Sequence, residues 1–143
     1  MRIAQHCLTI GLLAVLAGCS KVQIPASQLQ SSEASYEAAV EALRAKDFAA
    51  ALEKFNAAID EAGLNADLLA EAMLRSAECH IELGNLDEAA AVLEGLSDHA
   101  PEMDQYHLVC CKLYSKQGDA EKARAAFQAA REINPAVEAP VKL

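Results

Sequence analysis

The sequence predicts an all-α protein whose six helices pack in antiparallel pairs. Residues 70–103 and 104–137 align at an offset of 34 residues, and an earlier stretch repeats part of the same pattern. Within each copy, apolar residues recur every three or four positions, as on one face of a helix. Alanine, the strongest helix former, is abundant, and β-branched residues are scarce after the N-terminal segment. These three observations favour helices throughout and essentially no sheet.

The first helix pair is predicted from residues 32–65. Its second helix has the clearer pattern, formed by Phe48, Ala51, Phe55 and Ala58. Its first helix presents only small residues at the corresponding positions, which are Ser35, Ala38, Ala39 and Ala42. The connection to the next pair is four residues longer than the repeat requires. We assign the surplus to residues 62–65, where Gly63 would end one helix and Asn65 would start the next.

The second and third pairs share a set of landmark residues. The aligned positions are Gly84 and Gly118, Ala89 and Ala123, Leu93 and Phe127, and Pro101 and Pro135. The glycine suits a turn with positive φ between the paired helices, and Asp119 after Gly118 can cap the helix that follows. The alanine permits a close helix crossing, the large apolar residue fills the space between the helices, and the proline stops the second helix.

A 34-residue period with small, aromatic and proline landmarks resembles the tetratricopeptide repeat, a helix–turn–helix unit. The resemblance covers residues 32–137 and implies a right-handed α-solenoid of about three repeats, at about residues 32–65, 70–103 and 104–137. Such a unit cannot bury its apolar face alone, so stacked copies share one continuous core and expose a concave surface. The resemblance therefore implies a binding scaffold rather than an enzyme, and we assign no catalytic residue.

In this family the concave surface is lined by the first helix of each repeat. By resemblance, the concave positions of the three repeats are Glu33, Tyr36, Val40 and Leu43, then Glu71, Leu74, Glu78 and Ile81, then Gln105, Leu108, Lys112 and Ser115. Among these, the residues that we assign to partner binding are Tyr36, Val40, Leu74, Glu78, Leu108 and Lys112. They predict a mainly aliphatic groove edged by Glu78 and Lys112, suited to an amphipathic helix or an extended apolar segment of a partner protein. The alternative is that some of these aliphatic side chains belong to the core between repeats. Chaperone-binding members hold a carboxylate with Lys and Asn at positions that here carry Tyr36, Val40, Arg75 and Gln105, so such a clamp is not expected.

The first 18 residues have the pattern of a signal peptide. Arg2 precedes a mostly apolar stretch at 3–17, which is shorter than the ~20 residues needed to span a bilayer. Leu16-Ala17-Gly18-Cys19 then resembles the lipobox of bacterial lipoproteins, in which the chain is cut before the cysteine and the cysteine is acylated. The resemblance implies removal of residues 1–18 and lipidation of Cys19. The alternative is an ordinary secretory signal followed by a chance cysteine.

Residues 19–31 are predicted to form a polar tether between the lipid and the repeats, because they contain Pro25 and no sustained apolar period. The alternative is a first helix that starts at about Ser27. Ser20, rather than Asp, follows the lipidated position, and in Gram-negative lipoproteins this favours the outer membrane. At the other end, residues 138–143 are too short for the solvating helix that many family members add. The last helix is then expected to cap the stack itself, with a homodimer through that helix as the competing possibility.

Composition and charge limit the partners. Asp and Glu number 21 against 12 Lys and Arg, which gives a net charge of −9. A chain this acidic is repelled by nucleic acid and by anionic lipid headgroups, so membrane attachment must come from the acyl chains at Cys19. No phosphate-binding loop, nucleophile elbow or zinc-protease motif is present, and we expect no cofactor and no metal.

Three cysteines of the repeats permit a sharper hypothesis. Cys79, Cys110 and Cys111 could be imagined as a metal or thiol centre, but neighbouring helical residues diverge by ~100°, so Cys110 and Cys111 cannot both face one ion. The chain also contains no Cys-x-x-Cys pair. We expect plain core thiols at positions where the family packs its core. The alternatives are a disulfide from Cys79 to Cys110 or Cys111, and a thiol- or metal-dependent function.

The sequence thus predicts a lipid-anchored scaffold that docks a partner protein or peptide in its concave groove at the periplasmic face of a bacterial membrane. By resemblance, small lipoproteins of this build include pilotins of secretion and pilus systems and subunits of outer-membrane assembly machines. A self-assembling structural repeat is a third possibility.

Overall fold

The structure is a computed structural model, and it describes residues 25–97 and 103–142. The predicted signal peptide, Cys19 and the first part of the tether lie outside the described residues, as does Pro101. The described part of the chain contains six helices and no strand. The helices are α1 (Ala26–Arg44), α2 (Phe48–Asp60), α3 (Ala66–Leu83), α4 (Leu86–Leu96), α5 (Met103–Gln117) and α6 (Ala120–Ile133). None of them is long and apolar enough to cross a membrane.

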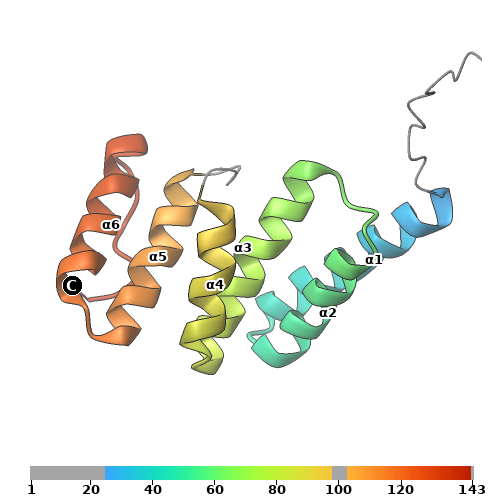
Figure 1. The fold of residues 1–143 in the computed structure, drawn as a ribbon, viewed down its shortest axis with the longest axis horizontal. Coiled ribbons are helices and arrows are strands. Elements are labelled where there is room, and N and C mark those ends of the chain that lie inside the picture. Colours follow the sequence, from blue (N-terminus) through green and yellow to red (C-terminus); the bar gives the residue numbers. More distant parts are fainter. Residues whose placement is uncertain (1–24, 98–102, 143) are drawn as a thin grey trace, which may run out of the picture.

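The helices pack as three successive pairs along the longest axis of the molecule (Figure 1). Each pair consists of neighbours in the sequence, α1 with α2, α3 with α4, and α5 with α6. The pairs connect in turn, because α2 also packs on α3, and both α3 and α4 pack on α5. The predicted all-α solenoid of three helix pairs is confirmed.

Local chemistry sets the turns within and between the pairs. Gly84 and Gly118 have φ values of 84° and 80°, as the sequence predicts for turns that favour glycine. Asp47 and Asp119 cap α2 and α6, because each carboxylate accepts a hydrogen bond from the backbone N–H three residues later. Asn65 caps α3 in the same way at 2.9 Å from the Leu68 nitrogen, as predicted.

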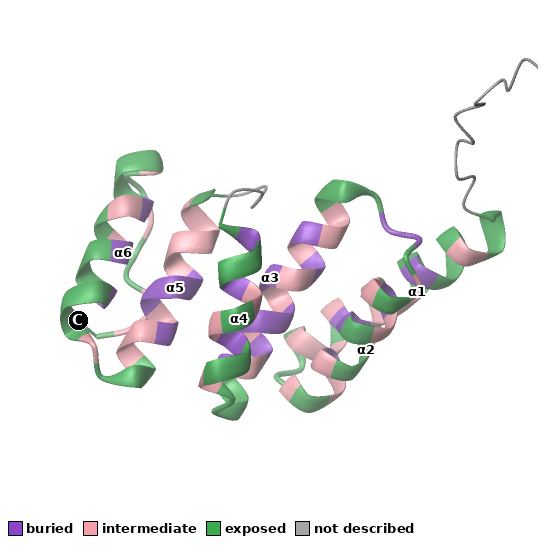
Figure 2. Cartoon of the chain, in the orientation of Figure 1, coloured by how far each residue is buried: buried purple, intermediate pink, exposed green. Residues whose placement is uncertain are grey.

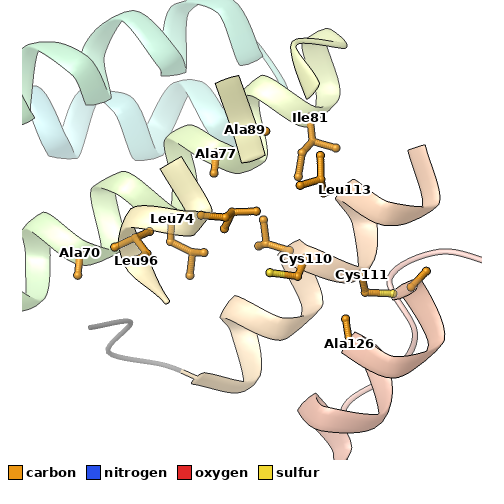
Figure 3. Close-up of a cluster of buried hydrophobic side chains, with 13 residues drawn as sticks. Ala70, Leu74, Ala77, Ile81, Ala89, Leu96, Cys110, Cys111, Leu113 and Ala126 are labelled. Atoms are coloured by element: carbon orange, nitrogen blue, oxygen red, sulfur yellow. The ribbon is translucent and has the colours of Figure 1, made fainter. Parts of the chain in front are cut away.

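The buried side chains form two clusters that meet at α3. The first core contains Ala39, Ala51, Phe55, Ala58, Leu64, Ala72 and Cys79. The second core contains Ala70, Leu74, Ala77, Ile81, Ala89, Leu93, Leu96, Val109, Cys110, Cys111, Leu113, Ala123 and Ala126 (Figure 3). Buried positions therefore run along nearly the whole of α3, which joins the two cores (Figure 2).

The first helix begins earlier than the preferred prediction. We expected a tether up to residue 31, but α1 starts at Ala26, directly after Pro25. The alternative start at about Ser27 is the better description. Proline just before or at the first helical position is compatible with a helix start, because its missing N–H would have no helical partner there. Ser32 is fully buried, and its hydroxyl accepts a hydrogen bond from the Gly63 N–H, so this part of α1 packs on the α2–α3 loop.

Gly63 serves a different purpose from the one predicted. We expected it to end α2, but α2 ends at Asp60 and the positive φ, 53°, falls on Ala62. Gly63 instead lies against α1: a β-carbon there would come within 2.5 Å of the Ser32 hydroxyl and 2.6 Å of the Gln28 carbonyl oxygen. The residue is glycine because the backbones of the loop and of α1 meet at this point.

The C-terminal segment also differs from expectation. We predicted that α6 would cap the stack itself, but residues after α6 fold back along the α5–α6 pair (Figure 1). Asn134 donates a side-chain hydrogen bond to the Asp104 carboxylate at 2.9 Å, and Val141 packs against the second core. The segment is too short for a further helix, so it covers part of the last pair as an irregular strap.

Candidate functional site

A hollow of about 490 Å³ lies between α1 and α3, on the surface predicted to bind a partner. We call it the α1–α3 hollow. It is lined by Tyr36, Val40, Leu43, Arg44, Glu71 and Arg75. Four of these residues, all except the two arginines, occupy positions that the repeat pattern assigns to the concave surface.

The two walls of this hollow differ in chemistry. The α1 wall is formed by Tyr36, Val40 and Leu43, which are half-buried and pack on the first core. The Tyr36 ring meets the buried Phe55 ring edge to face, with centroids 5.9 Å apart and an interplanar angle of 64°. This contact holds the Tyr36 ring against a fully buried ring. The α1 wall is therefore a firm apolar surface.

The α3 wall is charged and continues as a chain of ion pairs toward α5. Arg75 lies 3.7 Å from the Glu71 carboxylate and 3.4 Å from the Glu78 carboxylate. Glu78 also pairs with Lys112 of α5. The Glu78 and Lys112 side chains are only 16% and 23% exposed, so water screens them less than it screens a surface pair. Glu78 and Lys112 occupy equivalent positions of successive repeats, which is why α3 and α5 bring them face to face.

The predicted aliphatic groove is wrong in its central part. Leu74 was assigned to partner binding, but it is only 2% exposed and lies in the second core. Ile81, at another concave position, is fully buried in the same core. Both are buried because α3 is covered on one side by α2 and on the other by α4 and α5. The alternative that some aliphatic positions belong to the core between repeats therefore holds for these two residues.

The structure places the six predicted partner-binding residues in four different environments. Tyr36 and Val40 share the α1–α3 hollow. Glu78 and Lys112 form an ion pair instead of edging an open groove. Leu108 is half-buried and does not line that hollow, and Leu74 is core. The candidate site is therefore only the part of the predicted groove that lies between the first two repeats.

Arg44 and Arg75 of the hollow were not among the predicted concave positions. Arg44 is exposed and pairs with Glu41, one turn earlier on α1. Arg75 is held between Glu71 and Glu78. The signal was present in the sequence, because residues three and four apart share a helix face and 71, 75 and 78 have that spacing. Their opposite charges predict the local pairs, but not the hollow that they line.

The Glu78–Lys112 pair should contribute measurably to stability. We expect a double-mutant cycle with Glu78→Gln and Lys112→Met to give a coupling free energy of about 1 kcal/mol, because the pair is mostly shielded from water. The matched control is the exposed Glu41–Arg44 pair, whose side chains are both 70% exposed. For Glu41→Gln and Arg44→Met we expect about 0–0.5 kcal/mol. Urea denaturation measures both cycles, and equal couplings would contradict the argument.

The three cysteines are buried thiols. They are free, so the alternative of a disulfide between Cys79 and Cys110 or Cys111 is not what the structure shows. Cys79 belongs to the first core, whereas Cys110 and Cys111 belong to the second (Figure 3). Burial raises the pKa of the Cys79 thiol from 9.0 to about 11, helped by the nearby charges of Glu78 and Glu82. Among the described residues, no three His, Cys, Asp or Glu side chains are grouped so that they could hold a metal ion.

These thiols should be unreactive while the protein is folded. Cys79, Cys110 and Cys111 all have a pKa raised by burial, and only the thiolate is a nucleophile. At pH 8 we expect a thiol-disulfide reagent to modify none of the three in the native protein and all three in urea. Fast modification of one thiol in the native protein would restore the thiol-centre hypothesis.

The Cys79 thiol should also make stability depend on pH. In the unfolded chain its pKa returns to about 9.0, whereas in the folded protein it is about 11. As the pH rises through this window, the unfolded chain loses its proton first, so the free energy of unfolding should fall. Cys79→Ala should give a shallower decline of stability between pH 9 and pH 11. If the free energy of unfolding fell equally steeply with pH in both proteins, Cys79 would not be the group responsible for the decline.

Comparison with protein families agrees with the repeat pattern. Two family models described as tetratricopeptide repeat match residues 42–109 and residues 112–137, which together make up about two thirds of the chain. A search of curated proteins finds no match. The matched residues extend from the end of α1 to just beyond α6 and include the α3 wall of the hollow. These matches show that the chain contains tetratricopeptide repeats, which the helix pairs of the structure form.

Proposed function

We propose that the protein is a lipid-anchored scaffold that binds a short segment of a partner protein in the α1–α3 hollow. Tetratricopeptide repeats bind protein partners, so a role in protein–protein interaction follows from the family. The observation that supports this particular site is the pairing of an apolar wall with a charged wall around one hollow of about 490 Å³. A concave site with a few polar groups among apolar ones is typical of peptide recognition.

The two walls indicate the kind of segment that fits. An aliphatic or aromatic side chain of the partner can pack on Val40 and Leu43. The partner's charged groups can reach Arg44, which is exposed and engaged only at the surface with Glu41. Glu71 is 39% exposed and can receive a lysine or arginine. The fitting segment is thus amphipathic, with an apolar anchor beside charges of both signs.

Site-specific photo-crosslinking tests the location of this site. A benzophenone amino acid in place of Leu43 should crosslink the partner when the anchored protein is illuminated in cells of its host. The same amino acid in place of Glu53, an exposed residue of α2, is the control. We expect a discrete crosslinked product from the first position only. Products from both positions or from neither would place partner binding elsewhere.

We further propose that Cys19 carries the lipid and holds the scaffold on the periplasmic side of a membrane, the outer membrane in a Gram-negative host. The motif Leu16-Ala17-Gly18-Cys19 after an apolar stretch supports this proposal. Two or more acyl chains give stable attachment where one is marginal. Intact mass should show a mature chain that begins at an acylated Cys19, and Cys19→Ser should remain unprocessed. An unmodified Cys19 would rule out the anchor.

Within this proposal, a pilotin-like or assembly-factor role would use the hollow to bind one component of a larger machine. A homodimer through α6 is the competing arrangement, and the 53% exposure of the apolar Ile133 at the end of that helix supports it. Sedimentation of the mature chain over a range of concentrations separates the two. A mass that rises to twice the monomer and falls back in Ile133→Glu would favour the dimer.

A further inference from the structure

The first turns of α1 form a projecting end of the molecule. Figure 1 shows them at the opposite end of the solenoid from α6. The α2 helix ends at Asp60, and the loop after it meets α1 around Gln28 and Ser32. Residues 26–31 therefore extend beyond the end of α2 over a length of about 9 Å. We call these six residues the overhang.

Most of the overhang is open to the surroundings. Five of its residues are exposed and only Gln28 is half-buried, because its side chain donates a hydrogen bond to the Glu61 carbonyl oxygen. The exposed residues include Leu29, which leaves 41% of its surface uncovered and is one of four large apolar residues so exposed in the described part of the chain. Among the described residues, the α2–α3 loop covers one side of this end at Gln28 and Leu29, and nothing covers the other side.

The overhang lies in the part of the chain that has no acidic residue. All 21 acidic residues lie at position 33 or later, so no acid precedes Glu33. From residue 19 to residue 32 the only charged side chain is Lys21, and Val22, Ile24 and Leu29 add apolar groups. The nearest acid of the neighbouring loop, Glu61, turns toward Ser35 further along α1. The overhang is therefore an acid-free end on a strongly acidic protein.

The chain length between the lipid and the overhang is short. Six residues, 20–25, separate Cys19 from Ala26, and fully extended they reach only about 20 Å. An anchored protein must keep the start of α1 within that distance of the bilayer. Phosphate-bearing headgroups repel the acidic remainder of the domain, so electrostatics favours presenting the acid-free end.

We propose that the overhang is a membrane-contacting surface, whose partner is the headgroup layer of an anionic bilayer. Leu29 rests at the boundary between headgroups and acyl chains, and the solenoid extends away from the membrane with α5 and α6 farthest from it. The inference rests on the lipid anchor of the proposed function. Its consequence is a fixed orientation, in which the α1–α3 hollow lies near the membrane and faces partners beside it.

Introduced tryptophan residues test this orientation, because the chain contains no tryptophan. The acylated full-length Leu29→Trp protein is reconstituted into vesicles of phosphatidylethanolamine and phosphatidylglycerol with acyl chains brominated close to the headgroup. We expect loss of tryptophan emission and a shift to shorter wavelength on reconstitution. Ile133→Trp, which places the same reporter on an exposed position at the far end of α6, should keep its emission.

A second pair of variants tests the charge argument with the Leu29→Trp reporter. Gln30→Glu with Ser31→Glu puts two acids on the overhang and should restore much of the emission while the protein still floats with the vesicles. Ala125→Glu with Gln128→Glu adds the same charge on the exposed side of α6 and should change nothing.

The outcomes separate this inference from the anchor. If the Leu29→Trp protein carries the lipid and floats, but its emission is unquenched or no more quenched than that of the Ile133→Trp protein, the orientation alone is overturned. A protein that lacks the lipid by intact mass and does not float overturns the anchor and the orientation with it. Unchanged quenching in the Gln30→Glu, Ser31→Glu variant contradicts the electrostatic part of the proposal.

Discussion

Phe55→Ala is expected to lower the free energy of unfolding by about 3–5 kcal/mol, the cost of a large cavity in a packed core. Phe55 is the largest of the fully buried side chains in the described part of the chain. It lies in the first core, whose other fully buried side chains include Ala39, Ala51 and Ala58. Alanines cannot move inward to fill the space, so little of the lost contact can be recovered.

The expected loss is large for this fold, because domains of this kind have only about 5–15 kcal/mol of stability in total. Since the two cores meet only at α3, the damage should concentrate in α1 and α2. We expect urea denaturation followed by circular dichroism to show an early loss of part of the helical signal. Hydrogen exchange should locate that loss in residues 26–60, with α4 to α6 still protected.

Phe127 provides a matched control for this prediction. It occupies the same repeat position as Phe55, four residues after the small residue of the second helix, but it is only half-buried at the end of the solenoid. Phe127→Ala should therefore cost clearly less, about 1–2 kcal/mol, because less apolar surface is lost from contact. Equal losses of unfolding free energy in the two variants would contradict the argument that the deeper burial of Phe55 makes its loss more costly.

Gly63→Ala is expected to destabilise the protein by about 1–3 kcal/mol through overpacking. The added β-carbon would lie 2.5 Å from the Ser32 hydroxyl, 2.6 Å from the Gln28 carbonyl oxygen and 2.9 Å from the Leu29 α-carbon. Two of these three atoms belong to the backbone of α1, so a change of rotamer cannot relieve the clash. Separation of loop and helix would also break the buried hydrogen bond from the Gly63 N–H to Ser32, adding about 1 kcal/mol.

The same substitution at Gly95 should have the opposite sign. Gly95 lies inside α4 with open space around it, and a β-carbon there would meet nothing within 4 Å. Gly95→Ala should raise stability by about 0.5–1 kcal/mol, since glycine is a poor helix former. Thermal and urea denaturation of the two variants compare them directly. A stabilised Gly63→Ala protein would show that the loop and α1 are not in the close contact described.

The sequence by itself determined the helices and the turns of this protein. Besides the 34-residue period, the features that it predicted correctly are local: Gly84 and Gly118 at positive φ, and Asn65 and Asp119 as helix caps. Each depends on the conformational preference of one residue or on a hydrogen bond to a backbone group three residues away. Such effects are present in any context, so the sequence alone is enough to predict them.

Only the tertiary structure decided which side of each helix stays open. Leu74 and Ile81 look the same in the sequence as a residue that faces a partner, and α4 and α5 bury them. The first turns of α1 were missed because residues 26–31 have no apolar period. Gly63 was expected to end a helix, but a glycine is needed there because the loop backbone lies against Ser32, 31 residues earlier in the chain. Contacts between distant residues depend on how helices are placed against one another, and no single segment carries that information.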